Sequence, residues 1–176
     1  ENLIIGNFIG TDPGGTLPLA NGRGIELGPL TTNGLSTRIE GNLIAGNSTA
    51  LLADQAGAVT LINNRIGSGL QGQPLANGGG ILLGQSLRAN ILGNLIAYNQ
   101  GAAISGPTAG GSMQTANNII EYNGAGIACT GALGCVIRDN RIANNRGDGI
   151  VINVLRNSNL ERNTITTNGG HAVSVF

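Results

Sequence analysis

Seven asparagines recur along this chain, and each is followed two residues later by isoleucine. Four of the six steps between successive asparagines span 22–24 residues, and insertions lengthen the other two. Self-similarity at a fixed period predicts stacked structural units, none of which can bury its apolar face alone. The repeat therefore predicts a solenoid. The seven pairs are Asn7/Ile9, Asn42/Ile44, Asn64/Ile66, Asn94/Ile96, Asn118/Ile120, Asn140/Ile142 and Asn163/Ile165.

A second series of aliphatic residues keeps an interval of 23 residues. Short apolar alternations of period two, separated by Asn and Gly, are typical of strands rather than helices. Three such strands fit in one unit and leave no stretch for a helix. Equivalent strands would stack in parallel, about 4.8 Å apart, in an all-β parallel β-helix of about seven coils. Residues 1–176 would form one such domain. The series consists of Ile81, Ile104, Ile127, Ile150 and Val173.

The repeated asparagines have a structural explanation. Asn tolerates left-handed backbone torsions better than most residues, so each is expected at a sharp bend between two strands. Its amide donates and accepts, so equivalent side chains one coil apart can bond in a continuous ladder. The isoleucine two residues later should point into the core. In five units a second asparagine follows five residues after the first: Asn47, Asn99, Asn123, Asn145 and Asn168.

A leucine-rich repeat is the alternative fold, because it carries a similar aliphatic-x-x-Asn-x-aliphatic segment at a similar period. It would also need a helical or extended convex stretch and a leucine-rich concave strand. Here the rest of each unit consists of glycine turns and a Gly-Ile-x-aliphatic strand, as in residues 80–83 and 126–129. We therefore favour the β-helix.

Residues 7–16, Asn-Phe-Ile-Gly-Thr-Asp-Pro-Gly-Gly-Thr, lead to Asn-Gly-Arg-Gly-Ile at 21–25. This segment and the repeat as a whole resemble the right-handed parallel β-helix repeats of pectate-lyase-like secreted and surface bacterial proteins. The resemblance implies a right-handed coil and an extracellular or cell-surface location. It implies no particular activity, since that architecture carries lyases, hydrolases, epimerases, adhesins and structural fibres.

Charge is sparse and balanced, with nine acidic residues, nine arginines and no lysine. A nucleic-acid binder needs a basic stripe to neutralise phosphates, so we expect no nucleic-acid partner. The chain has no basic amphipathic helix for a membrane surface. Its apolar runs also fall short of the roughly 18 residues that span a bilayer.

The two cysteines, Cys129 and Cys135, flank five residues. A disulfide that closes this short turn is expected and would suit an oxidising compartment. The alternative is two small buried residues in neighbouring strands. Without a second cysteine pair or a nearby histidine, they do not form a zinc site, so we expect no metal and no cofactor.

Polysaccharide-cleaving enzymes that share this resemblance gather several acidic groups on one outer face of adjacent coils. We find no comparable set, and an isolated Asp/His pair lacks a nucleophile or a third acid. We therefore expect no catalytic residues and no enzyme. Three pairs of side chains lie 23 residues apart and should face each other in adjacent coils: Arg138 with Glu161, Asp139 with Arg162, and Asp148 with His171.

The two insertions end in the same sequence, Pro-Leu-Ala-Asn-Gly, at residues 18–22 and 74–78. Each precedes an equivalent closing strand, so both should protrude from the same edge of the solenoid. Loops on a rigid scaffold often carry recognition. They could shape a shallow groove for a polysaccharide or pack against a neighbouring molecule.

The sequence opens directly in one coil and stops at the end of a closing strand, without a capping helix. Unpaired strand edges favour edge-to-edge association. We expect a non-enzymatic extracellular β-solenoid that stacks head to tail with copies of itself into a filament, or that forms the stalk of a surface adhesin. The alternative is a carbohydrate-binding or polysaccharide-modifying β-helix with a groove at the insertions. The residues expected to mediate self-association are Leu3, Ile5, Val173, Val175 and Phe176.

Overall fold

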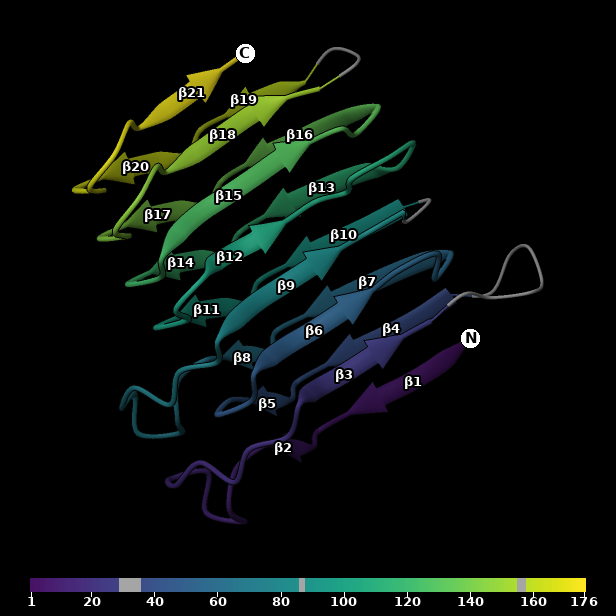
Figure 1. The fold of residues 1–176 in the computed structure, drawn as a ribbon, viewed down its shortest axis with the longest axis vertical. Helices are drawn as coiled ribbons and strands as arrows, with labels where there is room; N and C mark the ends of the chain where they lie inside the picture. The colour runs from purple at the N-terminus through teal and green to yellow at the C-terminus, as the bar shows by residue number, and fades with distance from the viewer. Residues whose placement is uncertain (29–35, 86–87, 155–157) are drawn as a thin grey trace.

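The computed structural model describes residues 1–28, 36–85, 88–154 and 158–176. Within these ranges the chain winds through three parallel sheets of seven strands each (Figure 1), and none of these residues is helical. Each sheet takes every third strand in chain order, so each turn of the coil contributes one strand to every sheet. The predicted parallel β-helix with three strands per coil is confirmed, and the leucine-rich-repeat alternative is wrong.

The 21 strands of the described residues are short, with two to six residues each. Sheet 1 contains β1 (Asn2–Ile5), β4 (Ser36–Glu40), β7 (Ala58–Ile62), β10 (Arg88–Leu92), β13 (Ser112–Ala116), β16 (Gly134–Arg138) and β19 (Asn159–Glu161). Sheet 2 contains β2 (Phe8–Ile9), β5 (Leu43–Ile44), β8 (Arg65–Ile66), β11 (Leu95–Ala97), β14 (Ile119–Glu121), β17 (Arg141–Ala143) and β20 (Thr164–Thr166). Sheet 3 contains β3 (Arg23–Leu27), β6 (Thr49–Ala53), β9 (Gly79–Leu83), β12 (Ala102–Ser105), β15 (Ala125–Thr130), β18 (Ile150–Asn153) and β21 (Val173–Val175).

The strand register follows the sequence repeat. In sheet 3, Ile104 pairs with Ile81 on one side and Ile127 on the other, and the series runs on to Val173. In sheet 2, the isoleucines that follow the asparagines pair with one another from Ile9 to Ile165. The extra residues of the longer units lie between the strands, so identical side chains stack directly over each other even where the interval between units varies.

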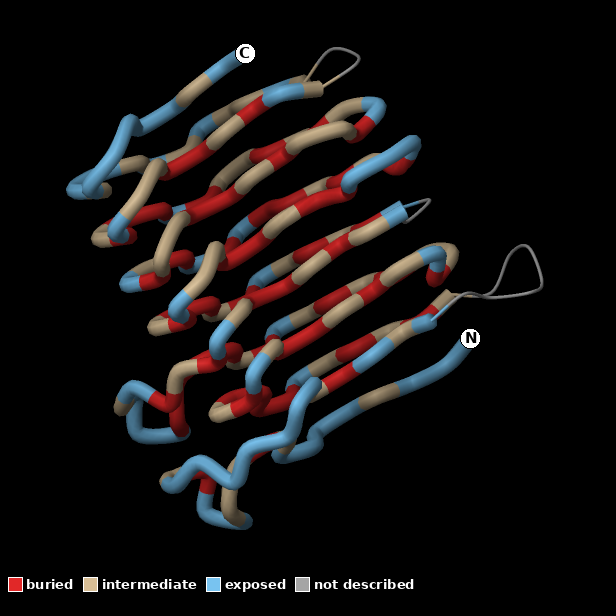
Figure 2. The backbone as a smooth tube through the Cα atoms, viewed as in Figure 1, coloured by how far each residue is buried: buried red, intermediate tan, exposed pale blue. Residues whose placement is uncertain are grey.

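The core is a column of aliphatic side chains enclosed by the three sheets (Figure 2). In sheet 2 the five central isoleucines of the column are fully buried, as predicted. Ile9 and Ile165, in the first and last coils, are partly exposed because a neighbouring coil covers only one side of each. A fully buried aliphatic side chain contributes about 1.5–3 kcal/mol, so the central coils carry most of the stability. The central five are Ile44, Ile66, Ile96, Ile120 and Ile142.

The prediction that the ladder asparagines themselves adopt left-handed torsions is wrong. The left-handed residue at each bend is the one before the asparagine. In six of the seven coils that residue is Gly, Asn or Asp, the types that tolerate positive φ best, and the seventh is an arginine. The seven are Gly6, Gly41, Asn63, Gly93, Asn117, Asp139 and Arg162, with φ between 50° and 68°.

Candidate functional site

The first asparagine series forms a continuous hydrogen-bonded ladder inside the coil, as predicted. Asn118 is typical: its Oδ1 accepts from the backbone N–H of Asn94 at 2.8 Å and from the Nδ2 of Asn94 at 3.0 Å. Its own Nδ2 donates to Asn140 Oδ1 at 2.9 Å and to the carbonyl of Ile91 at 2.8 Å. Every amide between the first and the last coil thus bonds to the coils on both sides. The same Nδ2–Oδ1 contact links all seven members, from Asn7 to Asn163.

A second ladder runs parallel to the first and has two more members than predicted. Asn21 donates to Asn47 Oδ1, and Asn47 in turn donates to Asn77 Oδ1. The ladder then continues through the four remaining coils to Asn168. Asn21 and Asn77 were not recognised in the sequence because the insertions displace them from the regular spacing. The shared Pro-Leu-Ala-Asn-Gly sequence therefore marks the point at which each insertion rejoins the ladder.

Each insertion forms a small hairpin, and both protrude at the same corner, as predicted (Figure 1). Hairpin 1, residues 11–20, links β2 to β3 and closes with an antiparallel bridge between Thr11 and Pro18. Hairpin 3, residues 68–76, links β8 to β9 and closes with a bridge between Ser68 and Pro74. The two hairpins are numbered by the coil to which they belong, the first and the third. The two hairpins lie over the outer face of sheet 2 and bury Leu43, whose side chain would otherwise face solvent.

Asp12 holds the tip of hairpin 1 in shape. Its Oδ1 accepts from the backbone N–H of Thr16 at 2.6 Å and of Leu17 at 2.7 Å. These backbone hydrogen bonds, that from Leu17 first, favour the ionised form and lower the pKa of the Asp12 carboxyl. The Asp12 carboxylate thus serves to hold the backbone of hairpin 1 in place.

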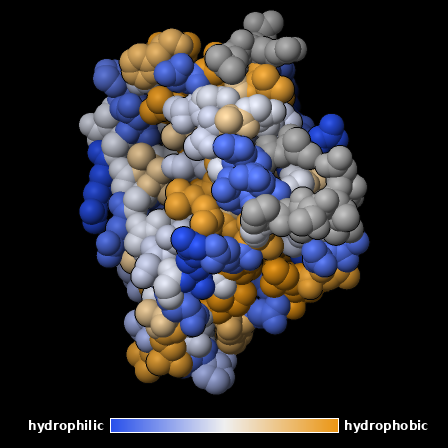
Figure 3. Space-filling view, turned by 45° about the vertical axis from the view of Figure 1, so that its right-hand side comes forward, coloured by the Kyte–Doolittle hydropathy of each residue, from blue (hydrophilic) through white to orange (hydrophobic). Residues whose placement is uncertain are grey.

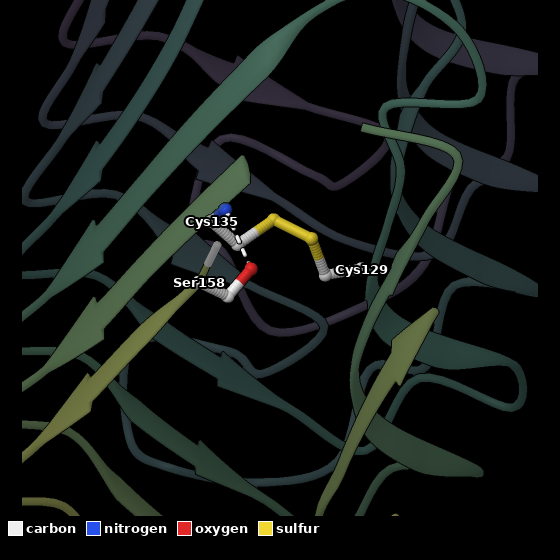
Figure 4. The surroundings of a disulfide bond; sticks show 3 residues. All are labelled: Cys129, Cys135 and Ser158. Carbon is white, nitrogen blue, oxygen red and sulfur yellow. Dashed lines mark hydrogen bonds between the residues drawn. A yellow bond between two sulfur atoms is a disulfide. The ribbon is translucent and has the colours of Figure 1, made fainter. Parts of the chain in front are cut away.

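The disulfide between Cys129 and Cys135 is present, as expected (Figure 4). It joins the end of β15 to the start of β16 across the turn between them, with the two Cα atoms 6.6 Å apart. Both cysteines are fully buried and belong to the aliphatic core. The Cys135 N–H donates to Ser158 Oγ at 3.0 Å, which ties this turn to the next coil. The disulfide therefore cross-links the corner between sheets 3 and 1.

The charged pairs agree with the sequence prediction in two cases of three. Arg162 bonds to Asp139 through Nε at 2.7 Å and Nη2 at 3.0 Å. Arg138 lies opposite Glu161 in the register but contacts Asp139 instead, at 3.2 Å, because that carboxylate lies between the two guanidinium groups. The predicted contact of Arg138 with Glu161 is wrong. The hydrogen bond from Arg162 is the main cause of the lowered pKa of Asp139.

Asp148 and His171 touch, as expected. Asp148 Oδ1 accepts from the backbone N–H of His171 at 2.6 Å and lies 3.3 Å from its Nδ1. The Ser174 hydroxyl donates to Oδ2 at 3.3 Å. The backbone hydrogen bond from His171 is the main reason why the pKa of Asp148 is lowered. The pair fastens the last coil to the coil before it.

A stacked tyrosine pair, absent from the sequence predictions, lies on the outer corner above the hairpins. The rings of Tyr98 and Tyr122 are 5.3 Å apart between centroids and inclined by 7°. Both residues have positive φ at the position before a second-ladder asparagine. Stacking of this kind contributes about 0.5–1.5 kcal/mol, which offsets part of the backbone strain. The two tyrosines are 24 residues apart, the same interval as the ladder residues Asn99 and Asn123 that follow them, so the repeat could have revealed that the two side chains would stack.

An open hollow of about 350 Å³ lies on the outer face of sheet 1. Its polar lining comes from Arg88, Asn90, Ser112 and Gln114. Among the residues that the structure describes, no group of three or more His, Cys, Asp and Glu side chains could hold a metal ion. The same residues include no helix with the length and hydropathy needed to cross a membrane.

The end residues predicted from the sequence point in different directions. Val173 and Val175 continue the inner columns of sheet 3, where they pair with Ile150 and Ile152. Leu3 and Ile5 are exposed but face outward from sheet 1, because the inward positions of β1 belong to Asn2 and Ile4. On the face drawn in Figure 3, hydrophobic surface is exposed at the top and bottom of the molecule as well as along its middle. A hollow at the C-terminal end is lined by Ile152, Leu160, Val175 and Phe176.

Three parallel sheets wound into a single coil define this chain as a β-solenoid. The family model described as the right handed beta helix region matches residues 49–176. The chain therefore belongs to the right-handed β-helix family, which confirms the resemblance and the handedness inferred from the sequence. No curated protein and no solved structure matches the chain.

Proposed function

We propose that the protein is a structural β-solenoid that stacks head to tail with copies of itself, as a filament or as the stalk of a surface adhesin. The carrying observation is that both asparagine ladders and all three sheets keep one register through the described coils, so a further coil of the same kind could add with the same contacts. At the first coil, Asn7 Oδ1 and Asn21 Oδ1 accept no hydrogen bond from any described residue. At the last coil, the backbone N–H groups of Asn163 and Asn168 lack the Oδ1 partner that their equivalents in the other coils have, with the exception of Asn77.

Stacking one copy on another would give hydrogen-bond partners to the free Oδ1 acceptors of the first coil and to the free N–H donors of the last coil. The N–H donors of the last coil would meet the Oδ1 acceptors of the next copy's first coil, at the spacing already used inside the chain. In the same register Val175 would lie over Leu27, because both belong to the same inner column of sheet 3. Such a contact is heterologous, so it propagates instead of closing.

A non-enzymatic role is supported by how three of the described carboxylates are used. Asp12 and Asp148 accept hydrogen bonds from the backbone, and Asp139 bonds to two arginines. Each has a lowered pKa, which suits structural anions and opposes a role as a general acid near neutral pH. The buried disulfide supports an oxidising, extracellular location.

Sedimentation velocity over a range of protein concentrations tests the stacking. Val175→Asp places a charge at the exposed end of the core column and should suppress assembly. Gln114→Glu adds the same charge on the outer face of the middle coils and should leave assembly unchanged. If the wild-type protein sediments as a monomer at every concentration, or if both variants assemble like it, the proposed stacking is wrong.

A second candidate function is polysaccharide binding, and the hollow on sheet 1 favours it. Its two side-chain amides and one guanidinium group, from Asn90, Gln114 and Arg88, can bond to sugar hydroxyls. Calorimetric titration with oligosaccharides tests this function. Binding that is lost in a Gln114→Ala variant would support it, and the absence of heat with neutral and acidic oligosaccharides would exclude those ligands.

A further inference from the structure

The chain has two tyrosines, and the fold brings both to the same corner between sheets 2 and 3. Tyr98 follows β11 in the fourth coil, and Tyr122 follows β14 in the fifth. The ladder asparagines that come directly after them, Asn99 and Asn123, are joined by a hydrogen bond of 2.9 Å. The ladder therefore holds the two tyrosines in register on adjacent coils.

Both tyrosines adopt backbone torsions that a bulky residue avoids. The φ angle is 63° at Tyr98 and 58° at Tyr122. Positive φ costs little for Gly and is tolerated by Asn, but it strains a residue with a large side chain. Two other coils have the residues expected at this position, Gly46 and Asn144. Because strained residues concentrate at functional sites, the two phenol rings are expected to do more than pack.

The rings are fixed at the backbone and open at their edges. The N–H of Tyr98 donates to the Glu121 carbonyl and that of Tyr122 to the Ala143 carbonyl, each from the next coil. Tyr122 is 47% exposed, and Tyr98 is partly exposed. Within the described ranges, no residue bonds to either phenol hydroxyl. Two nearly parallel phenols, 5.3 Å apart between centroids, are thus accessible from solvent at one corner.

We infer that Tyr98 and Tyr122 form an oxidative cross-linking site, at which a haem peroxidase with hydrogen peroxide joins the two rings as dityrosine. Each phenol loses one electron and its hydroxyl proton, and the two radicals couple through a ring carbon next to each hydroxyl-bearing carbon. The hydrogen on each coupled carbon then moves to the phenol oxygen and restores the hydroxyl. Overall, two C–H bonds break and one C–C bond forms. The two electrons and two protons released reduce hydrogen peroxide to two molecules of water.

The geometry favours coupling within one chain over coupling between chains. Adjacent coils lie about 4.8 Å apart, so a radical formed on one ring already has its partner beside it. Coupling requires the rings to tilt toward each other, and the exposed side of the corner leaves room for this motion. The cross-link needs no second copy of the chain, so it is independent of the proposed stacking.

The bond would join two coils that are otherwise held by non-covalent contacts at this corner. Each unit of a solenoid contacts only its neighbours, so coils can separate locally without unfolding of the whole chain. The disulfide between Cys129 and Cys135 links the fifth coil to the sixth at another corner. Dityrosine would link the fourth coil to the fifth, and the two bonds together would tie three successive coils.

Treatment of the purified chain with a haem peroxidase and hydrogen peroxide tests the site. We expect dityrosine fluorescence in the monomer band of a denaturing gel, with a mass lower by two hydrogen atoms. Peptide mapping should recover the peptides of Tyr98 and Tyr122 as one linked species. Tyr98→Phe and Tyr122→Phe keep the ring but lack the phenol, so each should abolish the cross-link.

Two double variants test whether the phenols must lie on adjacent coils. Asn144 occupies the same corner of the sixth coil, with φ of 57°. Tyr98→Phe with Asn144→Tyr again gives two phenols on adjacent coils and should restore the cross-link. Tyr122→Phe with Asn144→Tyr separates them by two coils, about 9.6 Å, and should give none.

The outcomes either support the site or exclude it. An unchanged monomer mass after oxidation of the wild type, or dityrosine found only in linked pairs of chains, contradicts the inference. Equal yields from the two double variants would also contradict it, because the yield would then not depend on the register of the coils. Circular dichroism of each variant should show the wild-type fold before oxidation, and the two single Phe variants, which remove only a hydroxyl, decide the question if a double variant does not fold.

Discussion

Replacement of one asparagine in the middle of the first ladder should cost far more stability than its size suggests. Asn118 is buried, and its side chain accepts two hydrogen bonds from Asn94 and donates to Asn140 Oδ1 and the Ile91 carbonyl. Each such bond contributes about 1 kcal/mol net, and the buried Asn94 N–H left without an acceptor costs about 1–3 kcal/mol. The three other bonds and the unpaired N–H together lead us to expect that Asn118→Ala lowers the free energy of unfolding by about 4–6 kcal/mol.

Asn118→Asp should cost still more. It keeps an acceptor for the Asn94 N–H but turns a carboxylate oxygen toward Asn140 Oδ1 and the Ile91 carbonyl, so a buried charge lacks donors. Asn7→Ala is the matched control, because Asn7 lies in the exposed first coil and loses few contacts. Guanidinium unfolding followed by far-ultraviolet circular dichroism measures all three. A loss below about 1 kcal/mol for Asn118→Ala, or equal losses for Asn118→Ala and Asn7→Ala, would refute the energetic role of the ladder.

Three further predictions concern the disulfide, the glycine at one bend of the coil, and the loss of stability at low pH. Replacing Cys129 and Cys135 together by alanine should cost about 2 kcal/mol, from the chain entropy of the short loop that they close, and unchanged chemical unfolding would contradict this. Gly46→Ala should cost more than about 1 kcal/mol, because φ is 76° there and a Cβ atom would lie 2.7 Å from a first-coil carbonyl. Gly41→Asn, also at positive φ but with open space around it, should change stability by less than about 0.5 kcal/mol, so equal losses would contradict the steric argument. Because the pKa of Asp148 is lowered in the fold, its stabilising effect is present above the ordinary carboxyl range and is lost as the pH falls through the lowered value. Asp148→Asn should therefore lose less stability than the wild type on acidification below about pH 4, and identical acid profiles would argue against the Asp148 contact.

The sequence was enough to predict the fold because the repeat sets the strand register. Identical residues one period apart had to stack, which placed the ladder of Asn118 and its equivalents and the column of Ile120. The proximity of Cys129 and Cys135 also followed, since a short turn between strands joins them. These features depend on spacing alone, and spacing can be counted in the sequence.

The sequence predictions fail where an insertion interrupts the repeat, or where they do not consider whether a side chain points into or out of the coil. Asn21 and Asn77 escaped notice because hairpins separate them from the preceding bend. Leu3 and Ile5 are expected from the sequence to mediate self-association at the end of the coil, but the alternation around the inward Ile4 turns both outward. The contact that Arg138 makes depends on side-chain rotamers, and the register gives no information about these.

Electron microscopy of the native chain at neutral pH is the most direct test of head-to-tail stacking. Seven coils at about 4.8 Å per coil give an axial repeat of about 34 Å per copy. The account predicts long, thin fibres with that repeat, whose number falls in the Val175→Asp variant. Single particles of one uniform size, with no fibres at any concentration, would contradict it.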